Sequence, residues 1–171
     1  VCGFAFLSEA YLRTDPAFTG RYTVPCVWDR RTGRIATNNY PDITIDLETA
    51  WAALHRPGAP DLYPEALRAE IDAVNADVYR DVNDGVYKAG FATSQAAYER
   101  AVVALFARLD ALEARLAERR YLVGGQLTEA DVRLYTTLAR FDAVYHYHFK
   151  CNLRRLTDYP NLWGYARDLY Q

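Results

Sequence analysis

The sequence contains no methionine, and this absence is the first of several that narrow what the chain can be. A natural reading frame begins with methionine, so we expect residue 1 not to be the natural start and the chain to be a fragment. Only three cysteines are present, Cys2, Cys26 and Cys151, far apart and without a CxxC pair. This odd, scattered set excludes a disulfide scaffold and favours a reducing, cytoplasmic setting.

Long hydrophobic runs and an excess of one charge are also missing. No apolar run approaches the roughly 20 residues that a membrane-spanning helix needs, and no signal peptide is visible. The net charge is −2 with both signs interspersed, which argues against nucleic acid or an anionic membrane as a partner. With 51% apolar and 25% charged residues, the chain is predicted to be globular.

The pattern of residues changes near position 56. Before it, the sequence predicts a helix over 5–13, strands at about 22–28 and 34–37, and a short helix over 41–53. Residues 56–64, RPGAPDLYP, are typical of a proline-rich linker. We therefore expect an α/β part over residues 1–55 and an all-helical part over residues 56–171.

The second part contains helical patterns only. Apolar residues recur every three or four positions from Leu67 to Val82, in a helix predicted to stop near Asp84 and Gly85. Similar stripes predict helices around 102–116 and 134–145, and a last helix over 160–170.

One helix has a strong start signal, the segment LTEADV. Thr128 is predicted to be its N-cap, and Asp131, three residues later, to be the acidic partner of a capping box. Such a cap stabilises a helix by about 0.5–2 kcal/mol. The signal explains why a helix with so apolar a face begins at this point.

Pro25 interrupts an extended apolar run, TVPCVWD, although a proline cannot donate a hydrogen bond to a neighbouring strand. One explanation is an ordinary proline on an edge strand. The other is a cis Val24–Pro25 bond. In that case the Val24 N–H and C=O point out of the sheet, where an extended peptide-like ligand can pair with them.

Four segments together resemble one family. They are GRYTVPCVWD, NDGVYKAGFATSQAAYERAV, RYLVGGQLTEADVRLYTTLARFDAVYHYHFKCN and DYPNLWGYARDLYQ. They are similar to the glutathionyl-hydroquinone reductases, the xi class of glutathione transferases, and the resemblance runs from about residue 4 to 171. It implies a truncated thioredoxin-like part followed by the all-α C-terminal domain of a glutathione transferase.

The resemblance also implies an activity. Members of this family remove glutathione from glutathionyl-hydroquinones through a mixed disulfide on a nucleophilic cysteine, which a second glutathione resolves. That cysteine precedes the matched region, so the resemblance places it outside this chain and implies that the chain is inactive by itself. It further implies a quinol thioether as substrate, no metal and a homodimer. The alternative is a non-catalytic binding or interaction module with the same fold.

The resemblance assigns a thiol-binding group. Val24 would make the backbone pairing, and Asn39 and Tyr40 stand where the family typically has Glu-Ser for the γ-glutamyl end of glutathione. Without that carboxylate, glutathione or another low-molecular-weight thiol is the expected co-substrate, although Asp42 is near. The expected thiol-binding residues are Arg21, Tyr22, Thr23, Val24, Asn39 and Tyr40.

Two tyrosines match the family's catalytic positions. Tyr87, in GVYKAGFA, matches a proton donor. We expect its side chain to turn into the substrate cavity, facing Tyr145, at a bend after Gly85. Tyr145, in FDAVYHYHF, matches a tyrosine that hydrogen-bonds the catalytic thiolate. With 14 tyrosines in the chain, only this motif context distinguishes the two from core or surface residues.

The segment that follows contains two further candidate groups. His146, His148 and Cys151 resemble a metal cluster, but two histidines two positions apart on a helix point to different sides, so no metal is expected. Arg154 and Arg155, with Lys150, are either a positive rim for an anionic ligand or a solvated turn. Cys26, directly after Pro25, is expected to be a small buried hydrophobic residue.

Overall fold

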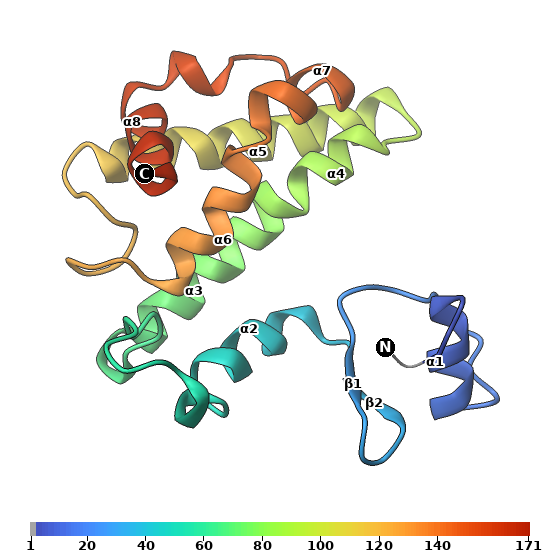
Figure 1. The fold of residues 1–171 in the computed structure, drawn as a ribbon. Helices are drawn as coiled ribbons and strands as arrows, with labels where there is room; N and C mark the ends of the chain where they lie inside the picture. Colours follow the sequence, from blue (N-terminus) through green and yellow to red (C-terminus); the bar gives the residue numbers. More distant parts are fainter. Residues whose placement is uncertain (1–2) are drawn as a thin grey trace. The chain divides into compact units, whose positions relative to one another are not determined.

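A computed structural model describes residues 3–171 as two compact units, the first ending at Ala59 and the second running from Pro60 to Gln171 (Figure 1). The first unit contains a two-stranded sheet and helices, and the second is all-helical. This confirms the predicted fold class, an α/β part followed by an all-helical part. Among the described residues, no helix is both long enough and apolar enough to span a membrane.

The first unit is built around a short antiparallel hairpin. Its elements are α1 (Leu7–Thr14), β1 (Val27–Asp29), β2 (Arg34–Thr37), α2 (Tyr40–Glu48) and a 3₁₀ turn (Ala52–Leu54). Gly33 adopts a positive φ of 68° in the turn between the strands, a conformation that glycine takes without strain. Asp29 closes the same turn by accepting hydrogen bonds from the Arg31 amide and the Thr32 hydroxyl, both at 2.8 Å.

The first strand is shorter than predicted. The sequence predicted a strand over 22–28, but only Val27–Asp29 pairs with β2. The physical reason is that a strand is defined by its pairing, and within the described residues only β2 pairs with this segment. The Val24–Pro25 bond just before it is cis, which is the second of the two explanations that the sequence left open.

A polar contact joins α1 to the hairpin. The Thr14 hydroxyl accepts a hydrogen bond from the Ile35 amide at 2.9 Å and donates to the Ala10 carbonyl at 2.8 Å. Ala10 and Tyr11 are the only buried residues among positions 3–59. The first unit therefore has very little core of its own.

The second unit is a bundle with a large apolar core. Its main helices are α3 (Arg68–Val78), α4 (Gly85–Gly90), α5 (Gln95–Leu116), α6 (Glu129–Leu138), α7 (His146–His148) and α8 (Pro160–Tyr170). In Figure 1, α3 lies against α6, and α5 lies against α4 and α8. The core consists of side chains with at most 1% exposure, among them Ile71, Val78, Leu105, Leu109, Leu134, Leu138, Phe141 and Leu162.

The α6 start signal operates as predicted. Thr128 is the N-cap, and Asp131 accepts hydrogen bonds from the Thr128 amide at 2.8 Å and the Thr128 hydroxyl at 2.9 Å. Both residues are fully buried. A local sequence signal therefore fixes where the central helix of the bundle begins.

The predicted helix end at Asp84 and Gly85 is wrong. Instead, α3 passes through a π-helical turn, Tyr79–Asn83, and continues into α4. Gly85 does not take the positive φ of a glycine that ends a helix. The Asn83 side chain explains the continuation, because it donates to the Arg133 carbonyl at 3.0 Å and to the Thr137 hydroxyl at 2.6 Å on α6.

Candidate functional site

Tyr87 and Tyr145, which lie 58 positions apart in the sequence, meet in the second unit. Their hydroxyl oxygens are 3.4 Å apart, and their rings meet edge to face with centroids 5.8 Å apart. Tyr87 is 43% exposed, whereas Tyr145 is only 3% exposed. The pair therefore presents one accessible phenol supported by one buried phenol.

Each of the two tyrosines is associated with a π-helical turn. The turn Tyr79–Asn83 comes before α4, the helix that contains Tyr87. Tyr145 is the last residue of a second such turn, Phe141–Tyr145. The wider hydrogen bonds are visible at both places, from the Asp84 amide to the Tyr79 carbonyl at 2.9 Å and from the Tyr145 amide to the Arg140 carbonyl at 3.4 Å. A π turn inserts one extra residue and rotates the helix that follows it. These two turns, and not the expected bend after Gly85, set the directions of the two phenols.

Burial further favours the neutral form of Tyr145. It raises the pKa of Tyr145 to about 12, and the hydrogen bond with Tyr87 adds to the rise. The Arg140 guanidinium, 6.0 Å from the centre of the Tyr145 ring, opposes the rise. At neutral pH Tyr145 is therefore a hydrogen-bond donor.

Two phenylalanines complete an aromatic cluster around the hydroxyl pair. The Phe149 ring lies 5.3 Å from Tyr87, 5.5 Å from Tyr145 and 5.3 Å from Phe91, measured between centroids. Phe91 is 72% exposed and stacks on Tyr87 at 6.2 Å. A flat aromatic molecule beside Tyr87 would thus meet ring faces as well as a hydroxyl group.

The expected thiol-binding residues lie in the first unit. Tyr22 and Val24 are exposed, and Val24 is 74% exposed. Within the described residues, the Val24 amide and carbonyl have no hydrogen-bond partner. Thr23 is anchored, because its carbonyl accepts from the Tyr11 hydroxyl at 2.8 Å. Val24 is therefore exposed to solvent, and its backbone N–H and C=O are available to bind a ligand.

Asn39 and Tyr40 stand at the start of α2. The Asn39 side-chain amide donates to the Asp42 carboxylate at 2.5 Å. The preceding residue, Asn38, reaches back to the Tyr11 hydroxyl at 3.1 Å and the Thr23 hydroxyl at 3.5 Å. These contacts hold the segments 21–24 and 38–42 side by side. They also place the Asp42 carboxylate next to Asn39, whereas the expected thiol-binding residues include no carboxylate.

The remaining candidates from the sequence are the possible metal ligands and the two cysteines Cys26 and Cys151. The described residues contain no cluster of three or more His, Cys, Asp or Glu side chains that could hold a metal ion. Cys151 is fully buried, and burial raises the pKa of its thiol to about 12, which makes it a poor nucleophile. Cys26 is half-buried, so its expected full burial is not observed.

The expected positive rim of Lys150, Arg154 and Arg155 is only partly available to bind an anionic ligand. Arg154 is engaged, because its guanidinium pairs with Asp110 at 2.5 Å and lies 4.5 Å from the centre of the Tyr159 ring. The Arg155 amide donates to the Asp158 carboxylate at 2.8 Å. Arg154 therefore ties the turn to α5 and does not offer its charge freely to a ligand.

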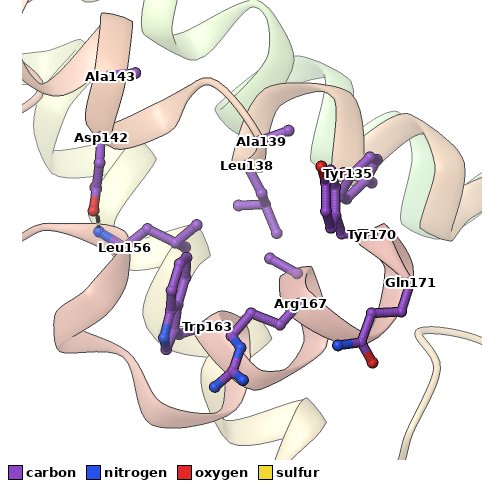
Figure 2. Close-up of a pocket in the computed structure, with 11 residues that line it drawn as sticks. Tyr135, Leu138, Ala139, Asp142, Ala143, Leu156, Trp163, Arg167, Tyr170 and Gln171 are labelled. Atoms are coloured by element: carbon purple, nitrogen blue, oxygen red, sulfur yellow. Dashed lines mark hydrogen bonds between the residues drawn. The ribbon is translucent and has the colours of Figure 1, made fainter.

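The second unit contains an apolar cavity of about 420 Å³ that no sequence signal indicated, and Figure 2 shows the side chains that line it. Side chains of α6, α8 and the segment between them line it, including Leu138, Leu156, Trp163 and Arg167. None of the expected site residues contributes to it. Sequence reasoning missed the cavity because its walls come from apolar helix positions that cannot be told from core positions.

The comparisons with known proteins cover both units. Residues 95–168 match the family described as "Glutathione S-transferase, C-terminal domain". The chain is 52% identical to glutathionyl-hydroquinone reductase YqjG of Escherichia coli K12, over 97% of this chain and 50% of that protein. The glutathione-bound structure of YqjG superposes with a TM-score of 0.92, over 97% of this chain and 54% of that one.

Two further solved structures agree. A glutathione transferase from Gordonia bronchialis is 57% identical with a TM-score of 0.96, over 100% of this chain and 53% of that one. The glutathione-S-transferase Xi of Phanerochaete chrysosporium is 52% identical with a TM-score of 0.91, over 96% and 53%. The chain spans about half the length of the curated relatives it matches. It belongs to the xi-class glutathione transferases, the family of the glutathionyl-hydroquinone reductases.

Proposed function

We propose that the natural protein is a thiol-dependent reductase that removes glutathione, or a related low-molecular-weight thiol, from glutathionyl-hydroquinones. The observation that carries this proposal is the pair of phenol hydroxyls, 3.4 Å apart, in which Tyr87 is accessible and Tyr145 is buried. The name of the E. coli relative, a glutathionyl-hydroquinone reductase, supports the same reaction.

The proposed chemistry breaks a carbon–sulfur bond. A cysteine thiolate, which the family resemblance places outside this chain, attacks the sulfur of the thioether and forms a mixed disulfide. The electron pair of the broken bond stays on the quinol carbon, which must then take up a proton. A second thiol then displaces the cysteine from the mixed disulfide. The quinol carbon is thereby reduced, and the sulfur from the thioether and the sulfur of the second thiol leave joined as a disulfide, while the cysteine is regenerated.

Tyr87 is the proposed proton donor. Tyr87 is 43% exposed, and the aromatic rings of Phe91 and Phe149 beside it suit a flat quinol ring. The Tyr145 hydroxyl, held neutral by burial, is the proposed hydrogen-bond donor to the thiolate or to the Tyr87 oxygen as Tyr87 loses its proton. Both roles need neutral phenols at physiological pH.

The thiol is proposed to bind at residues 21–24 and 38–42. The unpaired backbone of Val24 offers one donor and one acceptor to an extended peptide-like molecule. Arg21, Tyr22 and Thr23 border it, and Asn39, Tyr40 and Asp42 would receive its charged end. The Asp42 carboxylate, which lies beside Asn39, supports a thiol with an ammonium group, such as glutathione.

The assembly and setting of the protein are also proposals. We propose a homodimer, on the strength of its family, and a cytoplasmic setting. Among the described residues Cys26 and Cys151 are unpaired, which fits a reducing compartment. Light scattering on the purified natural protein would measure its mass, and a monomer would contradict the first statement.

Turnover of a glutathionyl-hydroquinone by the full-length natural protein tests the reaction. Quinol and oxidised thiol should form together, in equal amounts, with glutathione and more slowly with a thiol that lacks the γ-glutamyl ammonium group. Tyr87→Phe should lower kcat by roughly 10²-fold and change KM little, because it removes a group needed only in the transition state.

Tyr147→Phe is the matched control. Tyr147 lies in the same segment as Tyr145 and is 82% exposed, so the same change there should leave turnover intact. Full activity of the Tyr87→Phe protein would exclude Tyr87 as the donor. Absence of turnover in the unmodified protein would refute the proposed reaction.

A further inference from the structure

Phe149 lies at the centre of the aromatic cluster and contacts both tyrosines. Its ring is in edge-to-face contact with Tyr87 at 5.3 Å and in a tilted contact with Tyr145 at 5.5 Å. Tyr87 lies on α4, whereas Tyr145 ends the π-helical turn Phe141–Tyr145. Phe149 is therefore placed to hold together two phenols that come from different parts of the chain.

The Phe149 ring sits directly against Gly90. A Cβ atom built at Gly90 would lie 2.3 Å from Phe149 Cγ, 2.6 Å from Cδ1 and 2.7 Å from Cδ2. Gly90 does not have a positive φ, so its backbone does not itself require glycine. The reason for glycine at this position is the space that the ring occupies.

The backbone around Phe149 is held from both sides. The amides of Phe149 and Cys151 both donate to the Tyr145 carbonyl, at 3.2 Å and 3.1 Å. The Tyr98 hydroxyl on α5 donates to the Lys150 carbonyl at 2.6 Å. With its backbone anchored in this way, the Phe149 ring cannot move far from Gly90 without breaking these contacts.

We propose that Gly90 and Phe149 are positioning residues: Gly90 leaves the space into which the Phe149 ring packs, and that ring holds the Tyr87 and Tyr145 hydroxyls within hydrogen-bonding distance. The catalytic consequence rests on the proposed reductase function, but the placement of the two phenols does not. Neither residue has a group that can donate or accept a proton, so in the proton-transfer step both would act only through the tyrosines.

The test is a double-mutant cycle in the full-length natural protein, with Gly90→Ala, Phe149→Ala and the double variant. Each single change should lower kcat by roughly 10- to 100-fold through misplacement of Tyr87, with little change in KM for the thiol. If Gly90 acts only by admitting the ring, adding Gly90→Ala to Phe149→Ala should cause no further loss.

A second readout does not depend on activity. The titration of Tyr145 can be followed by NMR of ring-labelled tyrosine, with Tyr145→Phe to assign its signal. Burial holds the Tyr145 pKa at about 12, so opening the cluster by either single change should lower it towards the usual value of about 10. Tyr87 and Arg140 are the ionisable groups that face this phenol, and neither is altered by the two changes.

Gly164→Ala is the matched control. Gly164 also lies in a helix, but a Cβ atom there would meet nothing within 4 Å, so kcat and the Tyr145 titration should both stay unchanged. If Gly90→Ala prevents folding, Phe149→Leu, which keeps an apolar side chain but removes the ring, carries the test alone.

Two results would overturn the proposal: additive losses in the cycle, or an unchanged Tyr145 titration in the Phe149 variants. A protein without reductase activity would refute the proposed function, and the titration would still decide the role of Gly90 and Phe149. The two hypotheses can therefore fail separately.

Discussion

The carboxylate of Asp131 joins three separate segments of the second unit. Besides the Thr128 cap, it accepts hydrogen bonds from the Leu122 amide and from the Tyr165 hydroxyl on α8, both at 2.8 Å. Asp131 is fully buried, so water cannot replace any of these contacts. The carboxylate that caps α6 therefore also holds together α6, α8 and the loop before α6.

We expect Asp131→Ala to lower the free energy of unfolding by about 3 kcal/mol or more, because it leaves several buried donors unpaired. Thr128→Ala removes only the cap and should cost about 1 kcal/mol. Urea unfolding of both variants measures the difference. Equal losses would show that the Leu122 and Tyr165 contacts contribute nothing.

Sequence reasoning predicted half of this junction. Thr128 and Asp131 are three residues apart, and their spacing is a local signal. The contact with Tyr165 joins residues 34 positions apart, and no sequence period relates them. The contact between Tyr87 and Tyr145 likewise joins residues that are distant in the sequence, and only the family resemblance suggested that both belong to one site.

At the scale of the element, the two π-helical turns are what sequence reasoning missed. Asp84 and Gly85 were interpreted as a helix end, since glycine often ends a helix. The chain continues because Asn83 finds two acceptors on α6, and such tertiary partners override a local preference. The predicted starts of α6 and α8 were right, because both starts have local causes, the Thr128 cap for α6 and Pro160 at the first position of α8. The predicted continuation of α6 to residue 145 was wrong, because the helix ends at Leu138 and a π-helical turn follows.

We expect Asn83→Ala to lower the free energy of unfolding by about 1–3 kcal/mol, since two part-buried hydrogen bonds are lost and their acceptors are left on α6. Asn152→Ala, at an exposed asparagine, should change it by less than about 0.5 kcal/mol. Chemical denaturation of both proteins provides the comparison. Equal stabilities would show that the two Asn83 hydrogen bonds do not stabilise the fold.

At the scale of the whole molecule, the two units differ sharply in how much they bury. Only Ala10 and Tyr11 are buried among residues 3–59, whereas the helical unit has an extended core from Ile71 to Ala166. The predicted strand over 22–28 was too long for a related reason. Strand pairing depends on partners from elsewhere in the chain, and a short segment does not reveal them.

We expect residues 60–171, expressed alone, to be helical by circular dichroism and to unfold cooperatively, because their core is internal to that segment. Residues 1–59 alone should show no cooperative transition, since they bury too little apolar surface to offset chain entropy. Thermal melts of the two segments test this. A cooperative transition in the first segment, or none in the second, would contradict it.

The cavity in Figure 2 gives the helical unit a built-in optical reporter. The chain has three tryptophans, and Trp163, in the cavity wall, is the only one after Pro60. Fluorescence excited at the indole band in the isolated segment 60–171 would therefore come from Trp163 alone. Trp163 is 39% exposed, so a compound that enters the cavity and covers the indole should shift its emission to shorter wavelength.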